Sequence, residues 1–451
     1  MNRTQAVLAA FASAALLLPF SAFSAEEPSR LEALEQRLMA LEEKLEASEA
    51  TIEAQRELLK SQAAPAVNDG TGLDPFLSSV DIGGFITMSY IYNFNQPATN
   101  TFSQTLCQFN CNHDEFSFDA AQLSFGKEAA NPGDAGFQLD LLFGQNGDIS
   151  RFLSPTAGGA GVFGDSDFGV FVQEAYVTYN LNGTELKMGN FETLLGWELL
   201  DSHLNYNISH GVLFTWAIPL YHTGVMASGS LGENIGWSLG ITNGFNNVID
   251  LNDNKGVLGI ITFESGPLFT SLSAFSGSET SSAAAIAGAP NPGTTDNLSI
   301  FDFVVSFSPS DNLSFWLNAD YGIQDDVTVA SLGPGAAFDN TDSSYYGAAV
   351  GANFAINEKL SFAVRGEAWF DDDDIRGAGG FGGLDGAEVE IYTLTGTLKY
   401  QLTDNAYIRG ELRWDQADDD VPGVGGKIFP KGDVTDDETV FGIVEVSYVF
   451  D

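Results

Sequence analysis

Histidine is the residue type best suited to proton transfer near neutral pH, and three of the four histidines lie within or beside residues 193–218. Ser202 precedes His203 and Ser209 precedes His210, which gives the residue types of a nucleophile and its general base. Neighbours in sequence do not form a triad, and no G-x-S-x-G motif surrounds either serine. We therefore predict that these histidines are polar or hydrogen-bonded groups, that the protein is not an enzyme, and that it uses no cofactor.

The 61 acidic residues could also supply the carboxylate pair of a glycosidase, but their abundance makes any chosen pair uninformative. The acidic runs Asp371–Asp374 and Asp418–Asp420 offer the oxygen ligands that Ca²⁺ and Mg²⁺ prefer. Neither run has the spacing of an EF-hand, so a solvated acidic loop is the simpler interpretation. No metal site is predicted, and cation binding by these runs is the open alternative.

Cys107 and Cys111 lie close together in the run CQFNC. In an exported protein this spacing predicts a local disulfide that closes a loop. Nearby His113 and Asp114 leave a metal site as the alternative, although two thiols alone make a poor zinc site.

The formal net charge is −43, from 18 basic and 61 acidic residues. A field of this sign repels nucleic acid and attracts cations. The composition therefore excludes nucleic-acid binding and favours partners of positive charge.

Residues 1–24 have the three parts of a secretory signal peptide. Arg3 supplies the positive start, residues 6–23 are apolar, and Ala22-Phe23-Ser24 is a small-x-small cleavage site. No cluster of charges follows that would stop transfer, which disfavours a transmembrane anchor. We predict that the mature protein is exported.

Residues 25–62 follow a heptad pattern of about four repeats, which predicts an α-helical coiled coil. The apolar seam consists of Leu31, Leu34, Leu38, Leu41, Leu45, Ile52 and Leu59. Because a lone helix would expose this seam to water, we expect identical subunits to associate through it, as a trimer. A single amphipathic helix packed on its own chain is the alternative. Residues 63–78, rich in Pro, Gly, Asn and Asp, read as a linker.

Residues 79–451 alternate between apolar and polar side chains, as strands with one apolar and one polar face do. Residues 406–415 show this best, with Ile408 and Leu412 on one face and Arg409 on the other. Short turns follow every second strand, and long loops rich in Gly and Asp follow the others. A soluble sandwich has no reason to segregate its loop lengths, so we predict an all-β, antiparallel transmembrane barrel of about sixteen strands.

Several runs resemble the OmpL-like family of β-barrel outer-membrane porins over residues 80–451. They are KMGNFETLLGWELLDSHLNYNISHGVLFTWAIPLYHTGVMAS, SLGITNGFNNVIDLNDNKGVLGIITF, GGFITMSYIYNFNQP, FGKEAANPGDAGFQLDLLFG and QEAYVTYN. The resemblance implies a barrel with porin activity in the outer membrane of a Gram-negative-type bacterium, surrounded by outer-membrane lipid. It carries over no substrate and no site residues.

Charged side chains are costly on a lipid-facing surface, so the polar strand faces should point into the channel. A barrel of about sixteen strands is wide enough to leave that channel aqueous. Residues 193–218 are too aromatic for a solvated loop, and we expect them to fold inward as a constriction whose acids face basic residues of the strands. The predicted pore-lining residues are Glu192, Glu198, Asp201, His203, Asp320, Arg365, Glu367, Lys399, Arg409, Glu411, Arg413 and Asp415.

These features predict a porin that lets small hydrophilic solutes and ions diffuse passively, with a preference for cations and with its coiled coil in the periplasm. One alternative is a structural tether, in which the coiled coil docks to the cell wall and the barrel is an anchor. The other is a substrate-selective channel, in which the aromatic segment forms an apolar slide.

Overall fold

The computed structural model describes most of the chain after residue 78. The described residues are 79–98, 109–110, 112–152, 170–250, 253–280, 295–330, 338–376, 388–418 and 427–450. By internal contacts the chain divides into two units, Met1–Leu77 and Ser78–Asp451. The predicted signal peptide, coiled coil and linker lie outside the described residues, as does the predicted disulfide between Cys107 and Cys111.

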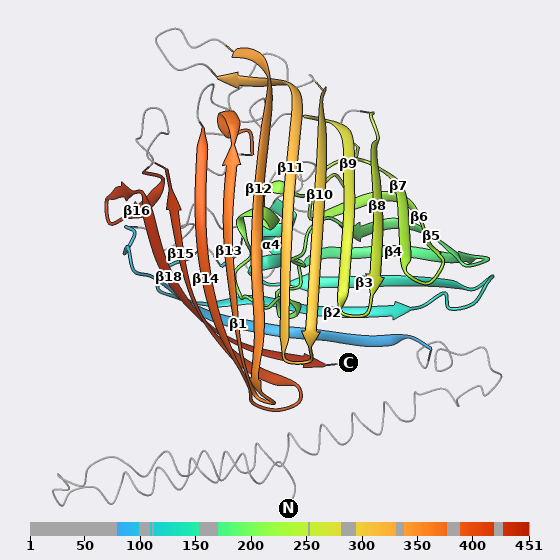
Figure 1. The fold of residues 1–451 in the computed structure, drawn as a ribbon, viewed down its shortest axis with the longest axis horizontal. Helices are drawn as coiled ribbons and strands as arrows, with labels where there is room; N and C mark the ends of the chain where they lie inside the picture. The colour runs from blue at the N-terminus through green and yellow to red at the C-terminus, as the bar shows by residue number, and fades with distance from the viewer. Residues whose placement is uncertain are drawn as a thin grey trace, which may run out of the picture. The chain divides into compact units, whose positions relative to one another are not determined.

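The described residues form a closed barrel of sixteen antiparallel strands, which confirms the all-β, sixteen-strand prediction (Figure 1). Its strands are β1 (Asp81–Asn93), β2 (Glu115–Lys127), β3 (Ala135–Phe143), β4 (Val170–Leu181), β5 (Thr184–Glu192), β6 (Tyr221–Leu231), β7 (Ile235–Thr242), β8 (Gly256–Ser265), β9 (Leu268–Thr280), β10 (Thr295–Ser310), β11 (Leu313–Ala330), β12 (Phe338–Asn357), β13 (Leu360–Asp371), β14 (Val389–Gln401), β15 (Ala406–Ala417) and β18 (Glu438–Phe450). Strand β18 closes the barrel by pairing with both β15 and β1.

The remaining elements are short. They are the helix α4 (Gln145–Phe152), the 3₁₀ turns η2 (Ser202–Leu204) and η4 (Asp372–Asp374), the π-helical turn η3 (Leu213–Ala217), and the hairpin of β16 (Phe429–Lys431) and β17 (Val434–Asp436). Within the described part of the chain, no helix has both the length and the apolar character needed to cross a membrane.

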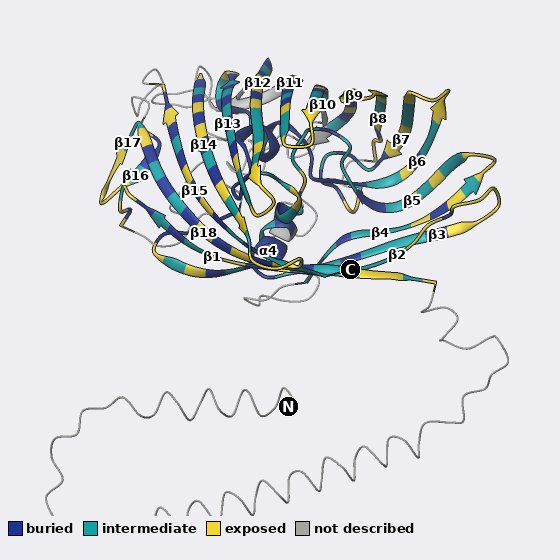
Figure 2. Cartoon of the chain, turned by 60° about the horizontal axis from the view of Figure 1, so that its bottom comes forward, coloured by how far each residue is buried: buried dark blue, intermediate teal, exposed yellow. Residues whose placement is uncertain are grey.

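The strands carry their apolar side chains outward and their polar side chains inward, the reverse of a soluble sandwich. In β14, Leu394 and Leu398 are exposed on the outer face, whereas Thr393, Thr395 and Thr397 are buried on the inner face. Figure 2 shows the same alternation of buried and exposed residues along the other strands. Because side chains alternate between the two faces of a strand, the period-2 pattern of the sequence dictates this arrangement.

The connections differ at the two ends of the barrel, as the sequence predicts. Asn182 and Gly183 join β4 to β5 with φ values of 54° and 92°. Two positive φ values in succession give a type I′ turn, whose twist matches that of the flanking strands. The longer connections follow the odd-numbered strands, and one of them, residues 193–220 between β5 and β6, is described throughout.

This connection, called the insert below, lies inside the barrel together with α4, as both views show (Figures 1 and 2). Its π-helical turn contacts β11 and β12. Trp197 stacks on Trp316 of β11 with ring centroids 5.6 Å apart, and the Tyr345 hydroxyl of β12 donates to the carbonyl of Ala217 at 2.7 Å. The buried apolar residues of the insert are Leu195, Leu200, Ile208, Val212, Leu213, Phe214, Ala217, Ile218 and Leu220.

An arginine on the outer face should destabilise the barrel, because lipid must cover this surface. Leu394 is 53% exposed in the middle of β14, and Leu394→Arg should cost about 2–4 kcal/mol of folding free energy. Leu402, 49% exposed beside the turn after β14, is the matched control, and Leu402→Arg should cost about 0–1 kcal/mol. Urea titration of the protein folded into phospholipid vesicles measures both, and equal costs at the two positions would contradict a lipid-facing band.

Candidate functional site

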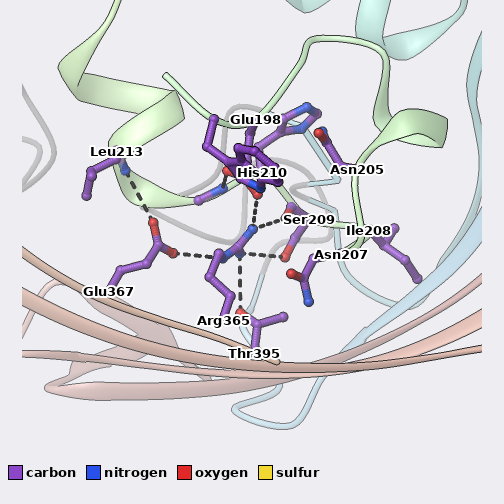
Figure 3. A network of polar contacts seen from close by, with 12 residues as sticks. Glu198, Asn205, Asn207, Ile208, Ser209, His210, Leu213, Arg365, Glu367 and Thr395 are labelled. Carbon is purple, nitrogen blue, oxygen red and sulfur yellow. Dashed lines mark hydrogen bonds and ion pairs between the residues drawn. The ribbon is translucent and has the colours of Figure 1, made fainter. Parts of the chain in front are cut away.

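Arg365 of β13 is completely buried beneath the insert (Figure 3). It binds the central part of the insert to the inner wall of the barrel. Its guanidinium forms ion pairs with Glu198 of the insert and, at 3.1 Å, with Glu367. Its Nη1 also donates to the carbonyl of Ser209 at 2.7 Å, and its Nη2 donates to Thr395 Oγ1 at 3.3 Å. Burial of a guanidinium without such partners would carry a large desolvation cost.

Two further arginines, both on β15, bind the backbone of the insert in the same way. Arg409 donates to the carbonyls of Asn205 at 2.8 Å, Asn207 at 3.2 Å and Ser202 at 3.1 Å. It also pairs with Glu445 of β18 at 2.7 Å.

Arg413 donates to the carbonyl of His210 and pairs with Asp415, each at 2.7 Å. Both arginines of β15 are about 1% exposed. Arg365, Arg409 and Arg413 are thus covered by the insert.

Strand carboxylates accept the backbone N–H groups of the same segment. Glu411 accepts from Ile208 at 2.6 Å and from Ser209 at 3.0 Å, and Glu367 accepts from Leu213 at 3.4 Å. Irregular backbone enclosed in a barrel needs such partners, because an unpaired buried N–H or C=O costs as much as a lost hydrogen bond. The charges of β13 and β15 therefore supply the pairing that a strand or helix would supply internally.

Gly211 allows two carboxylates, Glu198 of the insert and Glu367 of β13, to approach the backbone. Its N–H donates to Glu198 at 2.6 Å. A Cβ at this position would lie 2.2 Å from Glu367 Oε1 and 2.8 Å from Glu198 Oε2. Since Arg365 fixes both carboxylates, they have no room to move aside, and any side chain here would disrupt the contact.

The start of the insert is held by β10 and β11. Asn318 Oδ1 accepts from the Trp197 N–H at 2.9 Å, and Asn318 Nδ2 donates to Asp302 at 2.6 Å. Asp302 and Asp320 are directly opposite each other on the two strands, and both are buried. The predicted pore residue Asp320 thus belongs to the support of the insert.

Two of the predicted pore-lining acids, Asp201 and Glu192, accept hydrogen bonds from glutamines of the strands. Asp201 accepts from Gln122 of β2 at 2.9 Å and from Gln173 of β4 at 2.7 Å, and Gln173 also donates to Glu192. Burial raises the pKa of Asp201 to about 6, so this carboxyl is still mainly ionised at pH 7. Of the three acids predicted to face basic strand residues, Glu192 at the end of β5 and Glu198 and Asp201 of the insert, the described part of the chain brings only Glu198 to an arginine.

The histidines of the insert are packed among aromatic rings. His210 lies 4.3 Å from the ring centroid of Phe214, and its Nε2 is 2.9 Å from the carbonyl of Leu199. Burial lowers the pKa of His210 to about 3 and that of His203 to about 4, so both are neutral at pH 7. Ser209 Oγ accepts from Arg365 Nη2 at 3.4 Å, and no hydrogen bond among the described residues joins it to a histidine.

Lys399 and the acidic run Asp371–Asp374 are placed differently from the arginines, and most of the run Asp418–Asp420 lies outside the described residues. The Lys399 ammonium lies 3.8 Å above the ring of Tyr407 on the inner face and is only half-buried. Asp371 accepts from the N–H groups of Ile375 at 3.0 Å and Arg376 at 2.9 Å, so it caps a turn. Across the described ranges, no group of three or more His, Cys, Asp or Glu side chains is placed to hold a metal ion.

The structure adds residues that the sequence did not single out. Glu445 alternates with apolar neighbours in the last strand and could have been found by its period-2 position. Gln122, Gln173 and Asn318 are uncharged, and nothing in their local sequence marks them as contacts of a distant segment.

A family model described as "Putative beta-barrel porin-2, OmpL-like" matches residues 79–450. Among solved structures, the anion-selective porin from Comamonas acidovorans has a TM-score of 0.51 at 11% identity, over 82% of this chain and 99% of that one. Pseudomonas putida OprB gives 0.52 at 11% identity, over 84% and 96% of the two chains. At these identities the likeness shows the fold alone. Comparison with curated proteins finds no match.

Removal of Arg409 should release the insert locally, because three carbonyls would lose a donor and Glu445 would be left buried without its pair. Breaking a buried pair in this way costs about 3–5 kcal/mol. Arg409→Ala should therefore accelerate hydrogen exchange of the Ile208 and Ser209 amides in the detergent-solubilised protein. Lys399→Ala is the matched control and should leave exchange unchanged, whereas equal protection in both variants would show that Arg409 does not hold the insert.

Proposed function

Since the chain belongs to the OmpL-like family of β-barrel porins, whose model covers residues 79–450, we propose that it is an outer-membrane porin. It lets small hydrophilic solutes and ions diffuse passively across the outer membrane of a Gram-negative-type bacterium. The observation that carries the proposal is a closed barrel with an exposed apolar outer face and a polar inner face. Such a surface suits lipid outside and water inside.

The insert acts as the constriction of this channel. It enters the lumen from between β5 and β6, and arginines of β13 and β15 hold its backbone at Ser209, Asn205 and His210. Charge-assisted hydrogen bonds are about twice as strong as neutral ones, so an insert held by several of them is a fixed narrowing of the pore. This arrangement supports a permanent eyelet and gives no support to a lid that opens and closes.

The aromatic residues of the insert favour a general pore over an apolar slide. A slide needs aromatic faces that a passing solute can touch. Trp197 stacks on Trp316, and Phe214 is buried against His210. These rings pack on the inner wall, so the aromatic composition of the insert supports its folding.

In the sequence before the barrel strands, the heptads of residues 25–62 support association of three subunits through a periplasmic coiled coil. A structural tether to the cell wall is the second candidate, because the same helices could reach away from the membrane. Deletion of residues 26–62 separates the two functions. A porin should still conduct after the deletion, whereas loss of all channel activity would favour a barrel that depends on its tether.

Shortening the insert should widen the pore. The N–H of Thr193 donates to the carbonyl of Leu220 at 3.0 Å, so the two ends of the insert are adjacent and a short Gly-Ser turn can replace residues 194–219. In planar bilayers the wild-type protein should give discrete conductance steps, and the shortened variant should give larger steps. Correct folding is checked by β-sheet circular dichroism. Absence of steps from the folded wild type contradicts the porin proposal, and equal steps in the two proteins contradict the constriction.

A further inference from the structure

A second group of charges lies on the inner wall formed by β3, β4 and β5, away from the arginines. Asp140 of β3 and Glu174 of β4 are directly opposite each other in the sheet, where like charges repel. Glu174 accepts from the N–H of Glu192 at 2.9 Å, which brings the end of β5 to the same place. Asp140, Glu174, Glu192 and Asp201 of the insert are called the carboxylate cluster below.

A bulge in β4 concentrates polar groups here. The pairing of β3 with β4 shifts between Asp140 and Leu141, which are opposite Glu174 and Val172 and leave Gln173 as the extra residue. Bulges redirect side chains, and this one turns two consecutive side chains, Gln173 and Glu174, into the lumen. A regular strand would have sent one of them to the outer face.

Gln173 is aimed into the carboxylate cluster and is not fully satisfied there. Its amide nitrogen donates to Asp201 at 2.7 Å and also to Glu192. Its amide oxygen has no partner among the described residues, although the side chain is only 1% exposed. A buried polar atom without a partner calls for a ligand or water, and an amide oxygen beside carboxylates is a ligand type for hard cations.

The carboxylate cluster also lacks the counter-charges found on the other wall. Arg365, Arg409 and Arg413 each form an ion pair with a carboxylate, but none of the four cluster residues has one in the part of the chain that the structure describes. The ammonium of Lys187, which acts on Glu174 only at longer range, lies 4.2 Å from the ring centroid of Tyr176. The cluster therefore attracts cations, whereas the arginine wall is neutralised by its own partners.

A cavity of about 550 Å³ lies at the end of the barrel with the short turns. Its walls include Gln138, Tyr176 and Thr178 from the inner faces of β3 and β4. Gln138 donates to Asp140 at 2.8 Å, so one residue of the cavity wall contacts the cluster. Glu174, Glu192 and Asp201 each keep a partly exposed side chain.

We propose that the carboxylate cluster, Asp140, Glu174, Glu192 and Asp201, together with Gln173, binds a hydrated divalent cation and gives the pore its preference for cations. The binding rests on the cluster itself, and its effect on permeation rests on the proposed porin function. The cation keeps its inner water shell, because the described residues hold no cluster that could ligate a bare metal directly. Mg²⁺ gives up its bound waters reluctantly, which suits binding through the hydration shell.

The test uses isosteric changes that remove charge and keep the hydrogen bonds. Glu174→Gln retains an oxygen that can accept from the Glu192 N–H, and Asp140→Asn retains one for Gln138. The control is Glu233→Gln, the same loss of charge in the exposed short turn after β6. Folding of all variants is checked by circular dichroism and by the presence of conductance steps.

In a planar bilayer with a KCl gradient, the wild type and the Glu233→Gln control should be cation-preferring and partly blocked by MgCl₂. The Asp140→Asn/Glu174→Gln variant should lose most of the preference and need about tenfold more Mg²⁺ for half-block, as the loss of two attracting charges implies. An anion-preferring wild type, or a double variant that behaves as the wild type does, overturns the proposal.

Calorimetric titration of the full-length protein in detergent with MgCl₂ keeps the two proposals apart. Heat of binding that the double variant loses and the control retains supports the site, even if the wild type does not conduct and the porin function fails. Equal titrations of the wild type and the double variant overturn the site, whatever the conductance shows.

Discussion

The structure depends on one constraint, which is that the irregular backbone of the insert must find hydrogen-bond partners inside the barrel. Water serves this purpose for ordinary loops, but the centre of the insert is buried against the wall. Arginines of β13 and β15 supply donors to its carbonyls, and Glu411 and Glu367 supply acceptors to its N–H groups. The same contacts therefore stabilise the insert and fix the charged side chains of the inner face.

This constraint divides the inner wall into two parts with different chemistry. Where the insert is docked on β13 and β15, each of the three arginines is paired with a carboxylate, and these charges serve structure. On β3 to β5, carboxylates gather around Gln173 without arginine partners among the described residues. Among the described residues of the inner wall, carboxylates without an arginine partner thus gather on β3 to β5, where Asp201 of the insert joins them.

The insert also gives the barrel an apolar core. Barrels of this width have more interior space than strand side chains can fill. Here Phe214, Ile218 and Leu220 of the insert join Trp316 and Trp369 of the strands in one buried cluster. Residues 193–218 are unusually aromatic for a loop because they are packed inside the barrel. Their rings join the apolar cluster, and their backbone groups join the polar network.

The sequence by itself determined the strands, their number and their inward and outward faces, because side-chain alternation and turn residues are local properties that need no knowledge of the fold. It also identified Arg365, Arg409, Arg413, Glu367 and Glu411 as inward-facing. Tertiary structure decided their partners, since Glu411 meets Ile208 and Arg365 meets Glu198 across large separations in the chain. The bulge that turns both Gln173 and Glu174 inward could not be read from the sequence, because it depends on how β3 and β4 fall into register once the barrel closes.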